Sequence, residues 1–317
     1  MKKIVGVFLA WLVIYLFFCW KLPDTFLRAD SLELMMRQSV VIGLGAIGMA
    51  YVIMTGGIDL SAGSTIAATT MACAVTMKST NNPLLTLLAG LGIGAACGAF
   101  NGTLVSKLKV GPFIVTLATM LIIRGAAKGI GKEQTIGSVP ETWINTLTSK
   151  LGKDQTWMVM PPAAWVWIIL LVVMSLVMSR TVFGRNVVAI GSNERTASLC
   201  GVKVDRVKIG VYTIAGLFAS LAGIAQFARA GIGDPTIAQG DELRMIAAVV
   251  IGGGSLLGGE GSLVGAALGT LIMTTINMGC IQLGVANWVQ EIITGIIIVV
   301  AVALDRYRLQ RPQRVKV

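Results

Sequence analysis

Few residues of this 317-residue chain are of the types that catalyse reactions or bind metals. The chain contains no histidine, and its five cysteines, at positions 19, 73, 97, 200 and 280, show neither metal-ligand nor disulfide spacing. Imidazole metal sites, histidine-based triads and histidine proton relays are therefore excluded. We expect no metal site, no cofactor and no catalytic residues, and hence no enzyme.

One carboxylate is set apart by the glycines and hydroxyls around it. Asp59 lies in the run Gly-Gly-Ile-Asp-Leu-Ser-Ala-Gly-Ser of residues 56–64, between two apolar segments. A charge placed in membrane hydrocarbon costs about 3 kcal/mol on insertion scales, so Asp59 should face protein, water or a helix N-terminus. Asp59 and Ser61 suit the start of the next helix, where free N–H groups need acceptors. A capping junction at the cytoplasmic surface is the favoured interpretation, and a role in a permeation path is the alternative.

A second glycine-rich run, Gly-Gly-Gly-Ser-Leu-Leu-Gly-Gly-Glu-Gly-Ser, covers residues 252–262. It resembles a phosphate-binding loop but lacks the Gly-Lys-Ser/Thr ending and a preceding strand, so we do not expect nucleotide binding. Its likeness to residues 56–64 hints at an internal repeat without establishing one.

The composition indicates the elements that must position these residues. Apolar side chains make up 55% of the chain and charged ones only 13%, with a mean hydropathy of +0.80, whereas soluble domains are about 25% charged. We predict an all-α polytopic membrane protein of about ten transmembrane helices, forming a single domain over residues 1–317. The predicted spans are roughly 4–22, 38–56, 61–78, 84–106, 112–130, 162–180, 207–228, 244–258, 262–281 and 287–304.

The distribution of lysine and arginine predicts a sidedness. With the N-terminus inside, 15 of the 26 cations fall on the cytoplasmic side, which is the side they favour. This places both termini in the cytoplasm. The net charge of +11 is then a topology signal, and we expect no nucleic-acid surface. The fifteen cations are Lys2, Lys3, Lys107, Lys109, Arg180, Arg185, Arg195, Lys203, Arg206, Lys208, Arg306, Arg308, Arg311, Arg314 and Lys316.

Six of these cations lie in residues 180–208, a charged segment between two long apolar runs. Within it, residues 193–201 (Asn-Glu-Arg-Thr-Ala-Ser-Leu-Cys-Gly) predict a short helix. Asn193 can cap its start and Gly201 can take the left-handed conformation at its end. About two helical turns are marginal alone in water, so further contacts must hold this helix.

Two spans carry glycine at every fourth position, which lets membrane helices approach closely. Packing within the chain is the favoured interpretation, and a dimer seam is the alternative. The glycines are Gly94, Gly98, Gly102, Gly261, Gly265 and Gly269.

Arg124 is a cation near the end of an apolar run. It either lines a polar path or extends to the outer interface together with Lys128, and the interface is the favoured placement.

Several motifs, in one order, together resemble a known family. They are Thr-Gly-Gly-Ile-Asp-Leu-Ser at 55–61 with Gly63-Ser64, Pro-Phe-Ile-Val-Thr-Leu-Ala-Thr-Met at 112–120 with Arg124-Gly125, Thr-Val-Phe-Gly-Arg at 181–185, Ala-Ile-Gly at 189–191 with Asn193-Glu194, Ala197 and Gly201-Val202, and Glu242-Leu243 through Gly252-Gly253 and Gly258-Gly259. From about Ser39 to Arg306 the chain resembles the permease subunits of bacterial ABC importers of the ribose, xylose and galactose type. Two small departures, Ser192 in place of a glycine and Ala62 in place of a valine, change little.

The resemblance implies an assembly of several chains. The chain would pair with a second permease copy or a paralogue, two cytoplasmic ATP-binding subunits and a secreted solute-binding protein, within membrane lipid. ATP would be bound by the partner subunit. Residues 181–206 would be the coupling segment docked on that subunit. Glu194 and Arg195 would make polar contacts, Ala197 and Leu199 the apolar knob, and Asn193 and Gly201 the two ends of the helix.

The function implied is import of a neutral sugar, a pentose or hexose, through a mostly uncharged path. Candidate residues lining that path are Asp59, Ser61, Ser64, Asn101, Thr116 and Thr119. A permease for a related small polar solute and a self-contained facilitative carrier stay open as alternatives, as does a membrane-surface role for residues 193–201. The sequence does not name the sugar.

Overall fold

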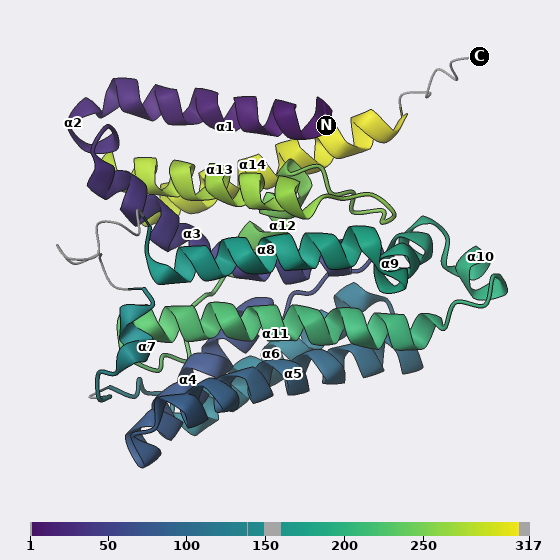
Figure 1. The fold of residues 1–317 in the computed structure, drawn as a ribbon, viewed down its shortest axis with the longest axis horizontal. Coiled ribbons are helices and arrows are strands. Elements are labelled where there is room, and N and C mark those ends of the chain that lie inside the picture. The colour runs from purple at the N-terminus through teal and green to yellow at the C-terminus, as the bar shows by residue number, and fades with distance from the viewer. Residues whose placement is uncertain (1, 138, 149–159, 311–317) are drawn as a thin grey trace.

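The computed structural model describes residues 2–137, 139–148 and 160–310, and this part of the chain is almost entirely helical (Figure 1). A single antiparallel bridge, between Ile136 and Gly233, is the only β pairing in these residues. The helices are α1 (Lys2–Lys21), α2 (Pro23–Phe26), α3 (Ala29–Met54), α4 (Ala62–Thr80), α5 (Pro83–Lys107), α6 (Pro112–Ile130), α7 (Trp143–Thr146), α8 (Pro162–Arg180), α9 (Val182–Ser192), α10 (Glu194–Leu199), α11 (Val204–Ala230), α12 (Asp241–Ile251), α13 (Leu263–Gln282) and α14 (Asn287–Gln310).

Eight of these helices are long and apolar enough to cross a membrane, namely α1, α3, α5, α6, α8, α11, α13 and α14. This confirms the prediction of an all-α polytopic membrane protein. The bounds of α6 and α8 coincide with the predicted spans 112–130 and 162–180. Proline starts both helices, where its missing N–H costs nothing.

The remaining two predicted spans differ from membrane-crossing helices. The 19-residue α4 is mostly buried inside the protein. The predicted span 244–258 was wrong, because α12 has only 11 residues and ends at Ile251. At about 1.5 Å per residue it reaches little more than half of the ~30 Å hydrocarbon layer. Glycines at 252–254, with Gly253 at φ +92°, end the helix early.

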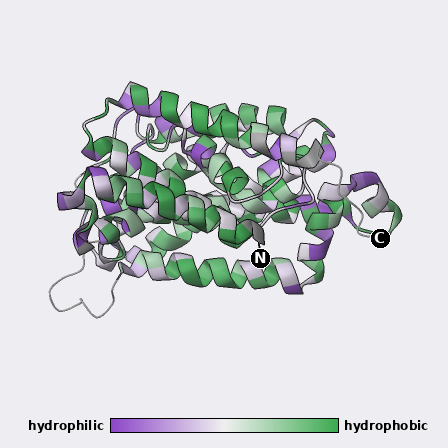
Figure 2. Cartoon of the chain, turned by 90° about the horizontal axis from the view of Figure 1, so that it is seen from above, coloured by the Kyte–Doolittle hydropathy of each residue, from purple (hydrophilic) through white to green (hydrophobic). Residues whose placement is uncertain are grey.

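The helices form a bundle whose centre is made by α3 and α11. In their most apolar stretches 78% and 61% of the residues are buried, against 11% for α1. Large apolar side chains such as Leu9, Leu88, Leu121, Ile169 and Val299 are exposed on the outer helices. Figure 2 shows hydrophobic residues along the lengths of these helices and hydrophilic residues mainly towards their ends. The exposed apolar faces are therefore the surface that lipid would cover.

The two ends of the bundle are unlike each other. α9 and α10 protrude at one end, and the first residues of α1 and the last turn of α14 point towards that same end (Figure 1). α2 and α7 lie at the opposite end. Arg311, Arg314 and Lys316, counted among the cytoplasmic cations, lie outside the described residues.

Both glycine rows lie at contacts within the chain. On α5, a Cβ added to Gly94 or Gly98 would overlap backbone atoms of α11, and one on Gly102 would lie 2.7 Å from the Cα of Ile209. In the other row, Cβ atoms on Gly265 and Gly269 would overlap the carbonyls of Gly252 and Ala248 at α12, and Gly261 lies against the side chain of Met54. Close backbone approach therefore fixes α11 on α5 and α12 on α13.

Candidate functional site

The protruding segment is built on α9, which turns off the end of α8. Thr181 separates the two helices and its hydroxyl accepts a hydrogen bond of 3.2 Å from the amide of Gly184, which caps α9. The Phe183 ring stacks on Tyr51 of α3, with ring centroids 6.2 Å apart. Tyr51 in turn donates a 2.7 Å hydrogen bond to the carbonyl of Met174 in α8. These contacts attach α9 to α3, the centre of the bundle.

The short helix α10 follows and has both of its predicted ends. The Asn193 side chain accepts a 2.9 Å hydrogen bond from the amide of Thr196. Gly201 has φ +84° and its amide donates to the carbonyl of Ser198 at 3.0 Å. The Val202 amide donates to the Ala197 carbonyl at 3.1 Å and closes the turn. Capping and a left-handed glycine therefore define α10 within the sequence itself.

Contacts within the chain hold α10, which corrects part of the sequence-based interpretation. Ala197 is only 4% exposed and belongs to the core, so it does not form an outward knob. Glu194 accepts hydrogen bonds of 2.8 Å at both carboxylate oxygens from Lys208 of α11. Leu199, by contrast, is 83% exposed. Arg195 is also exposed. The free surface of α10 thus offers one large apolar side chain and a cation.

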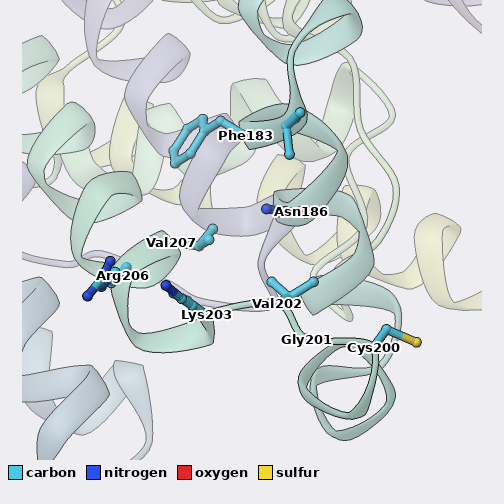
Figure 3. A pocket seen from close by; sticks show the side chains of 9 residues that line it. Phe183, Asn186, Cys200, Gly201, Val202, Lys203, Arg206 and Val207 are labelled. Carbon is cyan, nitrogen blue, oxygen red and sulfur yellow. The ribbon is translucent and has the colours of Figure 1, made fainter.

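A cleft of about 460 Å³ lies beside α10, between α9 and the start of α11. Figure 3 shows Phe183 of α9 on one side, Lys203 and Arg206 on the other, and Val207 between them. The cleft is therefore apolar on one side and positively charged on the other.

The two glycine-rich runs meet at the base of this protruding segment. The Gly259 amide donates a 3.0 Å hydrogen bond to the carbonyl of Met54, the last residue of α3. A Cβ on Gly191 of α9 would overlap that same carbonyl, and one on Gly258 would lie 2.8 Å from the nitrogen of Gly56. We call Met54, Gly56, Gly191, Gly258 and Gly259 the glycine junction. No local pattern in the sequence indicates that these three segments touch.

The run containing Asp59 forms a buried hydrogen-bonded cluster. One oxygen of Asp59 accepts from the amide of Ser61 at 2.9 Å and from its hydroxyl at 2.6 Å. Asn101 of α5 donates to the Ser61 hydroxyl at 2.7 Å. Thr116 of α6 donates to the carbonyl of Ile58 at 3.0 Å. The structure thus brings together Asp59, Ser61 and Asn101, three of the predicted path residues.

All six predicted path residues are at most 3% exposed. Thr119 donates to the carbonyl of Thr116 within its own helix. The hydroxyl of Ser64 and the side-chain oxygen of Asn101 have no hydrogen-bond partner among the described residues. The cluster fixes the turn between α3 and α4.

Residues 231–240 connect α11 to the half-length helix α12. Arg124 of α6 donates to the carbonyls of Pro235 and Ile237 at 3.0 and 2.7 Å. Arg124 therefore bonds to the backbone of its own chain, a contact that the sequence-based interpretation did not include. A Cβ on Gly63 of α4 would overlap the carboxylate of Glu242, so α4 and α12 begin side by side inside the bundle. Broken helices with polar groups at the breaks are typical of membrane transporters. The fold and the site are those of a multi-pass membrane transport protein.

The comparisons with known proteins agree with this class. Residues 31–302 match the family described as branched-chain amino acid transport system / permease component. The ribose import permease protein RbsC of Bacillus subtilis is 38% identical over 90% of this chain and 87% of its own length. The L-arabinose transport system permease protein AraH of Escherichia coli is 34% identical over 90% of this chain and 84% of its own. The fructose import permease protein FrcC of Rhizobium meliloti is 34% identical, over 90% and 80%. No solved structure matches the chain.

The chain therefore belongs to this family of transport-system permease components. It is a membrane-spanning transport subunit and not an enzyme.

Proposed function

We propose that this chain is the permease subunit of an ATP-driven importer for a neutral sugar, a pentose or hexose. The observation that carries the proposal is its similarity, over nine-tenths of its length, to permeases named for ribose, arabinose and fructose. The family description names branched-chain amino acids instead. An amino acid carries two charges and a sugar none, so the two substrate classes are readily told apart by experiment.

We place the attachment of the ATP-binding subunit at α10. The helix is held by its own chain, yet Leu199 is 83% exposed at the tip of a segment that protrudes from the bundle. An exposed leucine can insert into a pocket on a partner's surface, and the cleft beside it can accept a side chain of that partner. Lys203 and Arg206 on the rim of the cleft would pair with acidic side chains of that partner.

The glycine junction supplies a route by which movement of α10 reaches the membrane helices. Asn193 directly joins α9 to α10 and caps α10, and Gly191 of α9 touches the end of α3 and the loop before α13. These contacts are made by backbone atoms, so no flexible side chains separate the three segments. A displacement of α9 therefore shifts the ends of α3 and α13 together, in the way that packed interfaces switch between discrete arrangements.

The rest of the assembly follows from this placement. The end that carries α10 would face the cytoplasm of a bacterium, together with both termini, and the whole chain would form one permease domain in the inner membrane. The coupling segment would be residues 181–206. A second permease copy or a paralogue, two ATP-binding subunits and a secreted solute-binding protein would complete the importer. We assign the Asp59 cluster to holding the α3–α4 turn and not to the path.

Uptake by the complete importer tests the substrate class. Proteoliposomes containing the permease and ATP-binding subunits, supplied with the binding protein and internal ATP, would be offered labelled ribose, arabinose, fructose and leucine. Uptake of at least one sugar, without leucine uptake, is expected. Leucine uptake without sugar uptake would refute the sugar assignment.

A further inference from the structure

A polar cavity of about 270 Å³ lies between α3, α11, α12 and α13, away from the coupling segment. Its polar lining includes Gln38, Gln226, Arg229, Asp241, Arg244 and Asn277. Charged groups are energetically costly to place within a membrane-spanning bundle. In transporters, the polar and charged side chains that are found there mark substrate pathways.

The position of the cavity fits the entry side of an importer. Arg229 is the second-last residue of α11, and Asn277 is five residues from the end of α13. These helix ends lie opposite α10 (Figure 1). Arg229 also lines a second pocket, of about 380 Å³, together with Thr142 and Asn145 of the α7 region. Arg229 thus lines both the cavity and a pocket at the α7 end of the bundle.

The floor of the cavity is the start of the half-length helix α12. Asp241 is its first residue and accepts a 3.2 Å hydrogen bond from Arg244 one turn later. Residues 231–240, which precede it, are held by Arg124, and Glu242 lies against Gly63 of α4. Discontinuous helices that begin within the membrane build the substrate sites of many transporters. Here the break places a carboxylate and two guanidinium groups in one cavity.

The lining chemistry matches a neutral polyol. Asp241 supplies acceptors for hydroxyl groups, and the two arginines supply donors. Arg229 donates to Gln226 at 2.7 Å and Asn277 to Gln290 at 3.4 Å, and each guanidinium carries five N–H groups, so donors remain for a ligand. The Asp241–Arg244 pair compensates one positive charge. The volume is near the lower end of the ~300–1,000 Å³ typical of small-molecule sites, which suits a single sugar ring.

We propose that this cavity, which we call the Asp241 cavity, is a subsite that holds the sugar after it leaves the binding protein. The proposal rests on the proposed function. It differs from the sequence-based path candidates, because those six residues are buried and none of them lines this cavity.

Sugar preference is the readout that separates a subsite from a structural role. Asn277→Ala and Gln38→Ala each remove an amide from the cavity, on two different helices. Uptake of labelled ribose, arabinose and fructose by the complete importer would be measured side by side. We expect the ratio of rates between two sugars to change by about tenfold in at least one variant, because a lost hydrogen-bonding partner affects sugars with different hydroxyl positions unequally. ATP hydrolysis stimulated by the binding protein should persist.

Gln134→Ala is the matched control, since Gln134 is exposed in the turn after α6. It should leave the ratios unchanged. If both cavity variants slow all sugars equally, or slow none, the subsite is refuted while the proposed function stands. If the wild-type importer takes up no sugar at all, the proposed function fails and the subsite fails with it.

Discussion

The carbonyl oxygen of Met54, the last residue of α3, accepts a 3.0 Å hydrogen bond from the amide of Gly259, which lies 205 positions further along the chain. Gly191 of α9 lies against the same carbonyl. One backbone oxygen thus joins the central helix, the loop before α13 and the segment that carries α10. We propose that this contact couples α10 to the transmembrane bundle.

A methyl group at Gly191 should disturb this contact. In Gly191→Ala the new Cβ would overlap the Met54 carbonyl, and crowding of this kind typically costs about 1–3 kcal/mol or displaces the backbone. We expect sugar uptake per ATP hydrolysed to fall about tenfold, equivalent to ~1.4 kcal/mol, while hydrolysis continues. Both rates would be measured in the same proteoliposomes.

Gly129→Ala is the control for that variant, because a Cβ at Gly129 of α6 has nothing within 4 Å. Its ratio of uptake to hydrolysis should equal that of the wild type. An unchanged ratio in Gly191→Ala would rule out the junction as the transmitting contact.

Truncation of Leu199 should weaken partner binding without affecting the fold. Because the side chain is 83% exposed, Leu199→Ala should change the stability of the permease by less than about 0.5 kcal/mol. An anchoring side chain in an interface is worth roughly 2 kcal/mol, so affinity for the ATP-binding subunit should fall about thirtyfold. Binding would be measured with purified permease immobilised in nanodiscs.

Leu84→Ala offers a matched comparison, since Leu84 is an exposed leucine at the start of α5, at the other end of the bundle. It should bind the ATP-binding subunit as the wild type does. Equal affinities for the two variants would show that α10 is not the docking element.

The contact between α5 and α11 should tolerate no side chain at Gly98. Gly98→Leu would push against the backbone of Tyr212 and Thr213, with an expected loss of about 3 kcal/mol or more. The temperature of thermal unfolding in detergent should fall markedly. On the same helix, Gly92 has nothing within 4 Å, and Gly92→Leu should unfold at the wild-type temperature. A stable Gly98→Leu protein would contradict the packing described for α5 and α11.

The Asp59 cluster should contribute to stability and not to sugar selection. Asn101→Leu removes the amide that donates to the Ser61 hydroxyl. Leaving that buried hydroxyl without this hydrogen bond typically lowers the free energy of unfolding by about 1–3 kcal/mol. The unfolding temperature should therefore fall, and the relative uptake of different sugars should stay constant. Thr103→Val, at an exposed position two residues along, should change neither. A shifted sugar preference in Asn101→Leu would show instead that this cluster contacts the substrate.

Local signals explain which parts of this structure the sequence predicts. Prolines start α6 and α8 and long apolar runs continue them, so their bounds follow from the sequence alone. The cap of α10 at Asn193 and its left-handed end at Gly201 are likewise properties of a few adjacent residues.

What the sequence could not predict depends on contacts between distant segments. Arg124 bonds carbonyls 111 and 113 positions away, and no local pattern indicates such a partner. Ala197 was expected at the surface, but its burial depends on how α10 folds back on α9 and α11. The Asp241 cavity draws its lining from four helices. The error at 244–258 was of a different kind. A full span was predicted there, but three consecutive glycines end the helix at Ile251 within an otherwise apolar stretch.

The central claim is that a separate ATP-binding subunit drives sugar import through α10. Its most direct test is the initial rate of labelled-sugar uptake, with binding protein outside, into vesicles that hold either the permease alone or the permease with its ATP-binding subunits and ATP. Uptake should require both the subunits and hydrolysable ATP, and Leu199→Ala should reduce it. Uptake at the full rate by the permease alone would contradict the claim and identify a facilitative carrier.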